Sequence, residues 1–126
     1  MEKKIICANN APTPIGPYSQ AVQFGNLLFV SGQIPLDPAT GNLVMADIKE
    51  ETRQVMENLK AILTEAGLGF DNVLKSTIFL TDMGQFAQVN EIYGSYYPEN
   101  SPARAAYGVV KLPLGVLIEI ETIAGR

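Results

Sequence analysis

The sequence predicts an α+β fold, in which one mixed sheet carries two helices packed on one face. Two observations support this prediction: β-rich runs occupy both ends of the chain, and two segments between them have apolar residues at helical spacing. The chain has 126 residues, of which 47% are hydrophobic, and this is the size and composition of a single domain spanning 1–126. The predicted order of elements is β-β-β-α-β-α-β-β.

The first forty residues are predicted to form strands and turns. Lys4–Ala8 is a short β-rich run, and two further runs, Tyr18–Phe24 and Leu27–Ser31, flank the pair Gly25-Asn26. A Gly-Asn pair between two β-rich runs is typical of a hairpin turn. The turn-forming residues of Asp37–Gly41 separate these strands from the first helix.

The segment Asp47–Ala66 has the clearest helical pattern, because its apolar residues repeat at spacings of three and four and form one face. Its first residue can cap the helix, with Glu50 at the third helical position. Gly67 is placed to end the helix in a left-handed conformation. A second helix is predicted over Gln85–Tyr97, because a proline follows it.

Three more strands are predicted, over Val73–Thr81, Ala103–Val110 and Val116–Ala124. We expect the last two to pair as a hairpin. In that register Arg104 and Glu119 point to the same face, but they lie about four residues, roughly 13 Å, apart along the sheet. A shift of one residue would place them on opposite faces.

Several of these strands are apolar on both faces, as in residues 27–30 and 116–120. Two helices can cover only one face of the sheet, so the other face would remain an exposed apolar surface. Self-association is the simplest way to cover it, and we predict a homo-oligomer. Loops that fold over the second face are the alternative.

Arg104 is the most informative single residue, because it lies among small and apolar residues with no acidic residue within four positions. Its charge needs a partner if it is buried. That partner is either a carboxylate of the same chain or one that arrives with a ligand. A planar guanidinium suits bidentate capture of a small carboxylic acid. Ala106 and Gly108 are small residues on the same face, which leaves room beside Arg104.

The composition excludes several kinds of chemistry. The chain has no histidine, which rules out a Ser-His-Asp mechanism and a histidine-ligated metal site. Cys7 is the single cysteine, so neither a thiolate metal cluster nor an internal disulfide can form, and this fits a reducing compartment.

Charge and hydropathy exclude two classes of partner. The net charge is −4 and the 9 basic residues are scattered, which makes a nucleic acid a poor candidate. No apolar run approaches the ~20 residues that span a bilayer, and the first residues lack the apolar core of a signal peptide. We expect a cytoplasmic protein that contacts no membrane.

Three motifs resemble the Rid/YjgF family, and more specifically its RidA branch of enamine/imine deaminases. They are IGPYSQAV at 15–22, FVSGQIPLDPATG at 29–41 and PARAAYGVVKLPLGVLIEIE at 102–121. The segments between them match as well, so the resemblance covers essentially the whole chain. It implies a chorismate-mutase-like fold and a homotrimer with ligand clefts at the subunit interfaces. It also implies hydrolysis of 2-aminoacrylate/2-iminopropanoate and 2-iminobutanoate to 2-oxo acids and ammonia, without a metal or cofactor.

The same resemblance implies roles for three catalytic residues. Arg104 would bind the substrate carboxylate, Glu119 would position or activate the attacking water, and Tyr18 would hydrogen-bond the ligand. Taken singly, Tyr18 would be an ordinary boundary tyrosine and Glu119 a solvated strand carboxylate. The joint occurrence of the motifs is what favours the functional interpretation.

A further set is implied to contact the substrate beside Arg104: Ser31, Gly32, Asn90 and Ala106. Asn90 lies at the edge of the apolar face of the second helix, so it could also be a simple boundary amide. Many RidA members have a cysteine where this chain has Ala106. Hydration of an imine needs a fixed carboxylate, a water and a proton source, so we expect alanine to be tolerated.

Two other functions remain open on the sequence. Relatives of this type could bind 2-oxo acids without turning them over, because fold alone does not determine function. Some family members are described as endoribonucleases or translation inhibitors, but the acidic balance and the missing histidine argue against that activity here.

Overall fold

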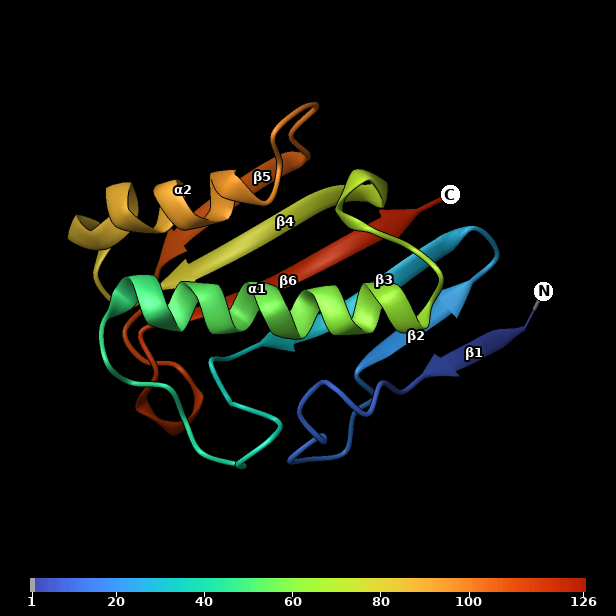
Figure 1. Ribbon diagram of the computed structural model, residues 1–126, viewed down its shortest axis with the longest axis horizontal. Helices are drawn as coiled ribbons and strands as arrows, with labels where there is room; N and C mark the ends of the chain where they lie inside the picture. Colours follow the sequence, from blue (N-terminus) through green and yellow to red (C-terminus); the bar gives the residue numbers. More distant parts are fainter. Residues whose placement is uncertain (1) are drawn as a thin grey trace.

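A single mixed sheet forms the centre of the computed structural model, which describes residues 2–126 (Figure 1). The order across the sheet is β1-β2-β3-β6-β4-β5, and β4 and β5 are the parallel pair in an otherwise antiparallel sheet. The strands are β1 (Lys3–Ile6), β2 (Ala21–Phe24), β3 (Leu27–Gln33), β4 (Val73–Leu80), β5 (Ala103–Gly108) and β6 (Ile118–Gly125).

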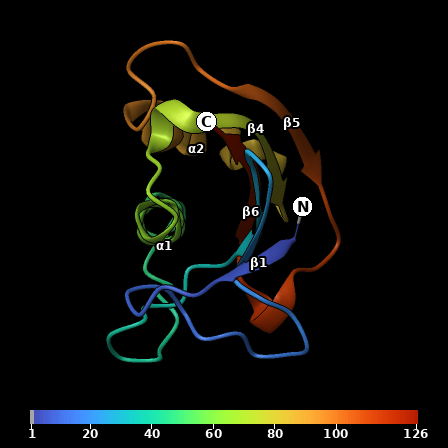
Figure 2. The same ribbon diagram turned by 90° about the vertical axis from the view of Figure 1, so that its right-hand side faces the viewer.

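Two helices, α1 (Ile48–Glu65) and α2 (Phe86–Ser95), lie on one face of this sheet, as the edge-on view in Figure 2 shows. The predicted α+β class and element order are therefore confirmed. Short 3₁₀ turns complete the fold: η1 (Phe70–Asn72), η2 (Met83–Gln85) and η3 (Pro113–Gly115). Within residues 2–126, neither helix has the length and hydrophobicity needed to cross a membrane.

The core lies between the helices and the strands. Alternate residues of the central strands meet the apolar face of α1, and burying each large side chain contributes about 1.5–3 kcal/mol. This packing fixes β3 and β6, the strands on which the site described below is built. The large apolar side chains buried in this core include Leu28, Val55, Met56, Leu59, Ile62, Leu63, Ile78, Leu80, Ile118 and Ile120.

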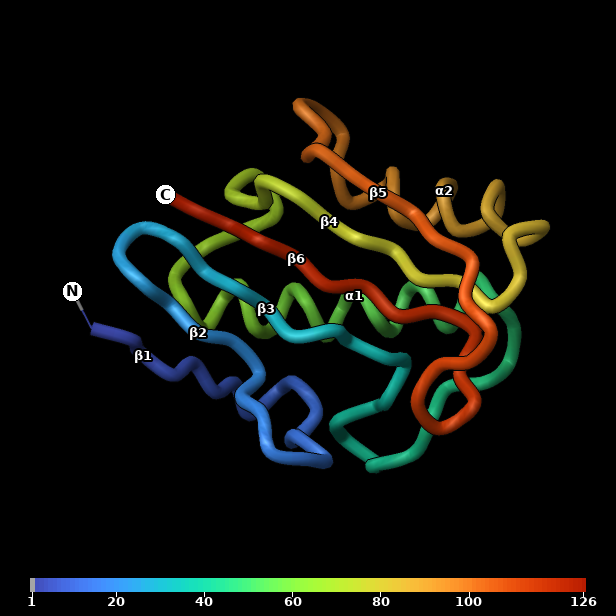
Figure 3. Tube along the Cα trace, turned by 180° about the vertical axis from the view of Figure 1, so that it is seen from behind, coloured from blue at the N-terminus to red at the C-terminus, as the bar shows by residue number. Residues whose placement is uncertain are grey.

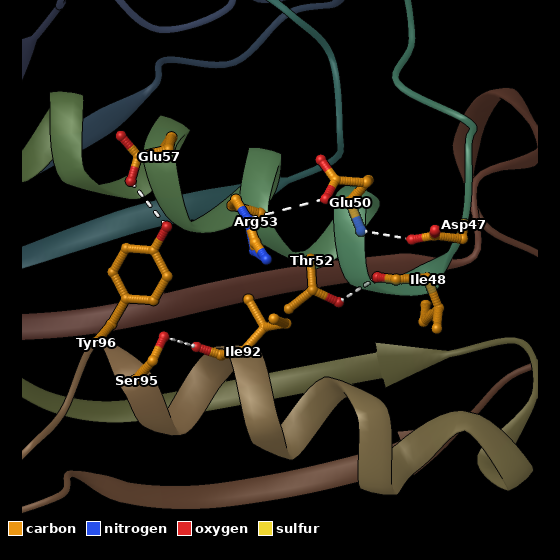
Figure 4. A network of polar contacts seen from close by, with 9 residues as sticks. All are labelled: Asp47, Ile48, Glu50, Thr52, Arg53, Glu57, Ile92, Ser95 and Tyr96. Carbon is orange, nitrogen blue, oxygen red and sulfur yellow. Dashed lines mark hydrogen bonds and ion pairs between the residues drawn. The ribbon is translucent and has the colours of Figure 1, made fainter.

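Capping sets the bounds of α1 as predicted. The backbone N–H of Glu50 donates to Asp47 Oδ1 at 2.8 Å (Figure 4). At the other end, Gly67 has a left-handed φ of 75°. The hydroxyl of Tyr96 donates to Glu57 Oε2 at 2.8 Å and links the end of α2 to α1. The second helix is shorter than the predicted Gln85–Tyr97 at both ends, because Gln85 belongs to the 3₁₀ turn η2 and Tyr96 is already the C-cap residue.

The predicted hairpin of the last two strands is wrong. β5 pairs in parallel with β4, whereas β6 lies between β3 and β4 and does not touch β5 in the sheet (Figure 3). The physical reason is the crossover through α2, which carries the chain from the end of β4 back to its start and makes β5 parallel to it. Residues 109–117 then lead past β4 to the centre of the sheet.

The face of the sheet opposite the helices is open (Figures 2 and 3). Loops do not cover it, contrary to the alternative considered above, and its large apolar side chains are about half exposed. Oligomerisation remains a prediction that this surface favours. The exposed apolar residues include Ile5, Phe24, Leu27, Phe29 and Tyr107.

Candidate functional site

A depression of about 500 Å³ lies on the open face, where β3 and β6 meet the loop before β2. Two carboxylates, those of Glu119 and Glu121, line it on the β6 side. Three of the predicted site residues, Tyr18, Ser31 and Gly32, line it as well, so the structure brings four predicted residues together. Its other lining residues are Ile15, Ile34 and Pro113.

Gly32 allows the carboxylate of Glu119 to lie directly against the backbone of β3. A Cβ at Gly32 would lie 2.8 Å from Glu119 Cδ and would overlap Oε2. The pairing of β3 with β6 also shifts register between Val30 and Gln33, as in a β-bulge. Glycine is therefore needed here for close approach, and the irregular pairing makes the space.

The pKa of the Glu119 carboxyl is raised above its ordinary value. Burial raises the pKa of this carboxyl, and the neighbouring charge of Glu121 raises it further. None of the residues that line the depression is a lysine or arginine. A carboxylate with a raised pKa is a stronger base, and such a group suits general acid–base chemistry.

The loop that carries Tyr18 is held by backbone and side-chain bonds. The hydroxyl of Ser31 donates to the carbonyl of Ser19 at 2.6 Å, so this side chain supports the loop. The backbone N–H of Ile15 donates to the Tyr18 hydroxyl at 3.3 Å. The buried side chain of Gln20 makes four hydrogen bonds to the backbone of residues 8–12. Tyr18 thus projects from a braced loop.

Arg104 lies elsewhere, on the edge strand β5, and its guanidinium rests on α2. Its Cζ is 5.0 Å from the ring centre of Phe86 and 5.3 Å from that of Tyr93. Its Nη1 donates to Asn90 Oδ1 at 2.7 Å. Of the two alternatives for its partner, a carboxylate of the same chain is not what Arg104 contacts; an amide and two aromatic faces hold it instead.

The expected space beside Arg104 is occupied. Ala106 and Gly108 do share its face, because they pair with Ile78 and Leu80 of β4. Ala106 packs against the hydrophobic core. A Cβ at Gly108 would lie 2.9 Å from Met83 Cγ. The small residues therefore allow the sheet and the segment before α2 to approach each other, and they do not open a pocket.

Arg104 and Glu119 point to opposite faces of the sheet, which corrects the predicted common face. Glu119 pairs with Phe79 in β4, and Phe79 pairs with Tyr107, three residues beyond Arg104. Two strand spacings and three residues separate their backbones by about 14 Å. One chain therefore does not bring both side chains to one small ligand.

Glu121, Gln20 and Glu51 are polar residues of this region that the sequence reasoning did not select. The sequence did contain a signal for Glu121: residues two apart in a strand share a face, and Glu121 follows Glu119 at that spacing. Gln20 and Glu51 are buried and bond to the backbone of distant segments, which local patterns do not show.

Comparisons with known proteins agree with this fold. The family model described as "Endoribonuclease L-PSP" matches residues 8–125. A RutC family protein of Pyrococcus horikoshii is 57% identical over 122 residues, covering 97% of both chains. The crystal structure of a Rid family protein from Yersinia pestis superposes with a TM-score of 0.97 at 48% identity, covering 99% of this chain and 100% of the other. The chain belongs to the Rid/YjgF family.

The Rid/YjgF assignment agrees with the predicted chorismate-mutase-like α+β fold. It also includes relatives with a named activity. A mouse protein named 2-iminobutanoate/2-iminopropanoate deaminase is 50% identical over 122 residues, covering 97% of this chain and 90% of its own. The motifs around Tyr18, Gly32, Arg104 and Glu119 thus occur in a Rid chain. Its fold places Arg104 on one face of the sheet and gathers the other three residues around the depression on the opposite face.

Proposed function

We propose that this Rid protein is a hydrolytic deaminase of small 2-imino acids and their enamine tautomers. Its substrates would be 2-aminoacrylate/2-iminopropanoate and 2-iminobutanoate, and its products 2-oxo acids and ammonia. The observation that carries the proposal is the Glu119 carboxylate against Gly32, in a depression lined without a cation. The name of the mouse relative supports the substrate class.

In the proposed reaction, Glu119 accepts a proton from water as the water oxygen attacks the imine carbon. The imine reacts in its protonated form, so the electron pair of the C=N bond neutralises the nitrogen, which becomes an amino group. Glu119 then passes its proton to this amino group, the C–N bond breaks and ammonia leaves. As the C=O bond forms, the proton of the hydroxyl group passes to Glu119 and from there to solvent. Orientation and general base assistance suffice for this step, because the imine carbon is already electrophilic. Tyr18 would hydrogen-bond the ligand from the loop.

The carboxylate of the substrate would be bound by Arg104 of a second copy. Arg104 and Glu119 lie on opposite faces of one chain, and the open apolar face needs a cover, so we infer a homotrimer with its ligand clefts between subunits. Asn90 would hold the guanidinium in place, since it already accepts a hydrogen bond from it. We expect the protein to act in the cytoplasm.

The main competing function is binding of 2-oxo acids without turnover, for which the same guanidinium would suffice. Cleavage of RNA is disfavoured by the net charge of −4 and by the two carboxylates of the depression, which would repel phosphates. Ala106 in place of the common cysteine leaves the proposed reaction intact, because no thiol takes part in it.

The test is a coupled assay in which a dehydratase releases the imine from serine or threonine and semicarbazide traps it. The wild-type protein should suppress trapping, whereas Arg104→Ala and Glu119→Ala should not. Undiminished trapping with wild type, together with tight binding of a 2-oxo acid, would identify a binding module instead.

Mixing the two inactive variants tests where each site is built. If Arg104 and Glu119 come from different copies, randomly mixed trimers should regain about a quarter of the wild-type activity, since that share of the sites has both residues intact. If one copy supplies both residues, no activity returns.

A further inference from the structure

Glu51 is a buried carboxylate that the proposed reaction does not use. It lies near the N-terminus of α1 with 1% of its surface exposed. Its Oε1 accepts a hydrogen bond from the backbone N–H of Leu117 at 3.0 Å, and the carbonyl of Leu117 accepts one from Thr81 at 3.1 Å. Both backbone polar groups of Leu117 are therefore held, one residue before β6 begins and two residues before Glu119.

The segment that Glu51 holds forms part of the candidate site. Residues 109–117 carry the chain from β5 to β6, and Pro113 of this segment lines the same depression as Glu119. The middle of the segment is exposed, since Val110 is 93% exposed and Leu114 is 58% exposed, whereas its ends are held: the N–H of Val109 donates to the carbonyl of Leu80 at 2.8 Å and Val116 is buried. Leu114 also has a left-handed φ of 59°, which is unfavourable for a leucine. The bond from Glu51 is thus made where the segment joins the rigid sheet.

The charge of Glu51 gives it no evident stabilising role. The ion pairs found within residues 2–126 join Lys49 to Glu91 and Arg53 to Glu50, and neither includes Glu51. Burial raises the pKa of the carboxyl, the hydrogen bond from Leu117 opposes this, and the charge of Asp47 raises the pKa further. An apolar side chain would fill a buried position at lower cost. The feature that an apolar residue could not supply is the acceptor for Leu117.

We propose that Glu51 is a positioning residue of the deaminase site, which fixes the start of β6 and so holds Glu119 against Gly32. The proposal rests on the proposed function of that site. Without the acceptor, the N–H of Leu117 would lose its partner, and the residues that lead into β6 would become more mobile. Glu119 lies two residues further on and would share that freedom.

Three variants separate positioning from folding. Glu51→Gln keeps an oxygen acceptor, and Glu51→Leu keeps the volume without an acceptor. Thr52→Val is the matched control, because Thr52 is equally buried and its hydroxyl bonds only to Ile48 within α1. We expect Glu51→Leu to lower kcat at least tenfold with little change in KM, and the other two variants to stay within threefold of wild type. If Glu51→Leu does not fold, Glu51→Ala replaces it, with the same direction expected.

A second readout does not depend on turnover. The titration of the Glu119 carboxyl is followed by carbon-13 NMR, with Glu121 and Tyr18 as the other titratable groups that face it. In the variant without an acceptor, the pKa of Glu119 should fall toward its ordinary value as water reaches the loosened strand. Glu51→Gln should restore the wild-type titration.

The outcomes distinguish this proposal from the function on which it rests. An acceptor-free variant with wild-type kcat and an unchanged Glu119 titration would overturn the positioning role. A wild-type protein without deaminase activity would overturn the proposed function, while the titration would still decide whether Glu51 positions Glu119. Equal losses in the acceptor-free variant and in Thr52→Val would show that Glu51 acts through general stability alone.

Discussion

Gly32→Ala is predicted to impair the reaction while leaving the fold intact. The added methyl group would lie 2.8 Å from Glu119 Cδ and 3.1 Å from its Cγ, whereas ordinary contacts begin at 3.4 Å. The neighbour is the end of a flexible side chain, so Glu119 can retreat without moving either strand. The strain is therefore relieved by displacing the proposed catalytic base.

The expected size of the effect follows from the displacement. Cδ must move by at least the difference between 2.8 and 3.4 Å, and the overlapping Oε2 must move further, so the carboxylate shifts by about 1 Å. A misplacement of about 1 Å costs about 100-fold in rate, which lies within the range that a general base contributes. The melting temperature should change by only a few degrees.

The coupled imine assay measures this effect against two controls. Gly94→Ala introduces the same methyl group in α2, where nothing lies within 4 Å, and should leave turnover unchanged. In a Glu119→Ala background, Gly32→Ala should leave the melting temperature unchanged, because the side chain that it displaces is already absent. Near-wild-type turnover of Gly32→Ala, or a melting temperature lowered by Gly32→Ala in the Glu119→Ala background, would refute the reasoning.

Three further predictions concern ionisation and stability. Glu121→Gln removes one cause of the raised pKa of Glu119, so the acid limb of the pH–rate profile should move to lower pH; an unmoved limb would contradict the coupling. Thr122→Val should leave the protein at least as stable in urea, because this buried hydroxyl has no hydrogen-bond partner within residues 2–126. Asp47→Ala removes the cap of α1 and should lower the free energy of unfolding by about 1 kcal/mol, and an unchanged urea midpoint would show that the cap is dispensable.

Local patterns were sufficient to predict most elements of the fold. The helical spacing and the cap at Asp47 predicted α1, and the Gly25-Asn26 pair predicted the turn between β2 and β3. The pairing of β5 could not be predicted in this way. Nothing in residues 109–117 shows that they lead past β4, and strands that are neighbours in the sequence are commonly paired in the sheet.

The candidate site was predictable only where its residues belong to recognisable motifs. Tyr18, Gly32 and Glu119 were selected by resemblance, whereas Arg104 was already singled out by its lack of acidic neighbours, and the structure places Arg104 apart from the other three. Glu51 was not predicted, because its partner Leu117 is 66 residues away in the sequence. The contact is made through the backbone N–H of Leu117, a group that every residue except proline has.

The separation of Arg104 from Glu119 has a chemical consequence. A salt bridge between them within one chain would lower the pKa of Glu119 and occupy the guanidinium, so neither group would be free for a ligand. Asn90 and the faces of Phe86 and Tyr93 hold Arg104 without neutralising it, since aromatic faces leave the in-plane N–H donors free. Glu119 meanwhile keeps a raised pKa beside Glu121. Neither Arg104 nor Glu119 therefore uses the other as an ion-pair partner. In the proposed trimer, the carboxylate of the substrate would meet Arg104 of one copy and its imine carbon would meet Glu119 of the next.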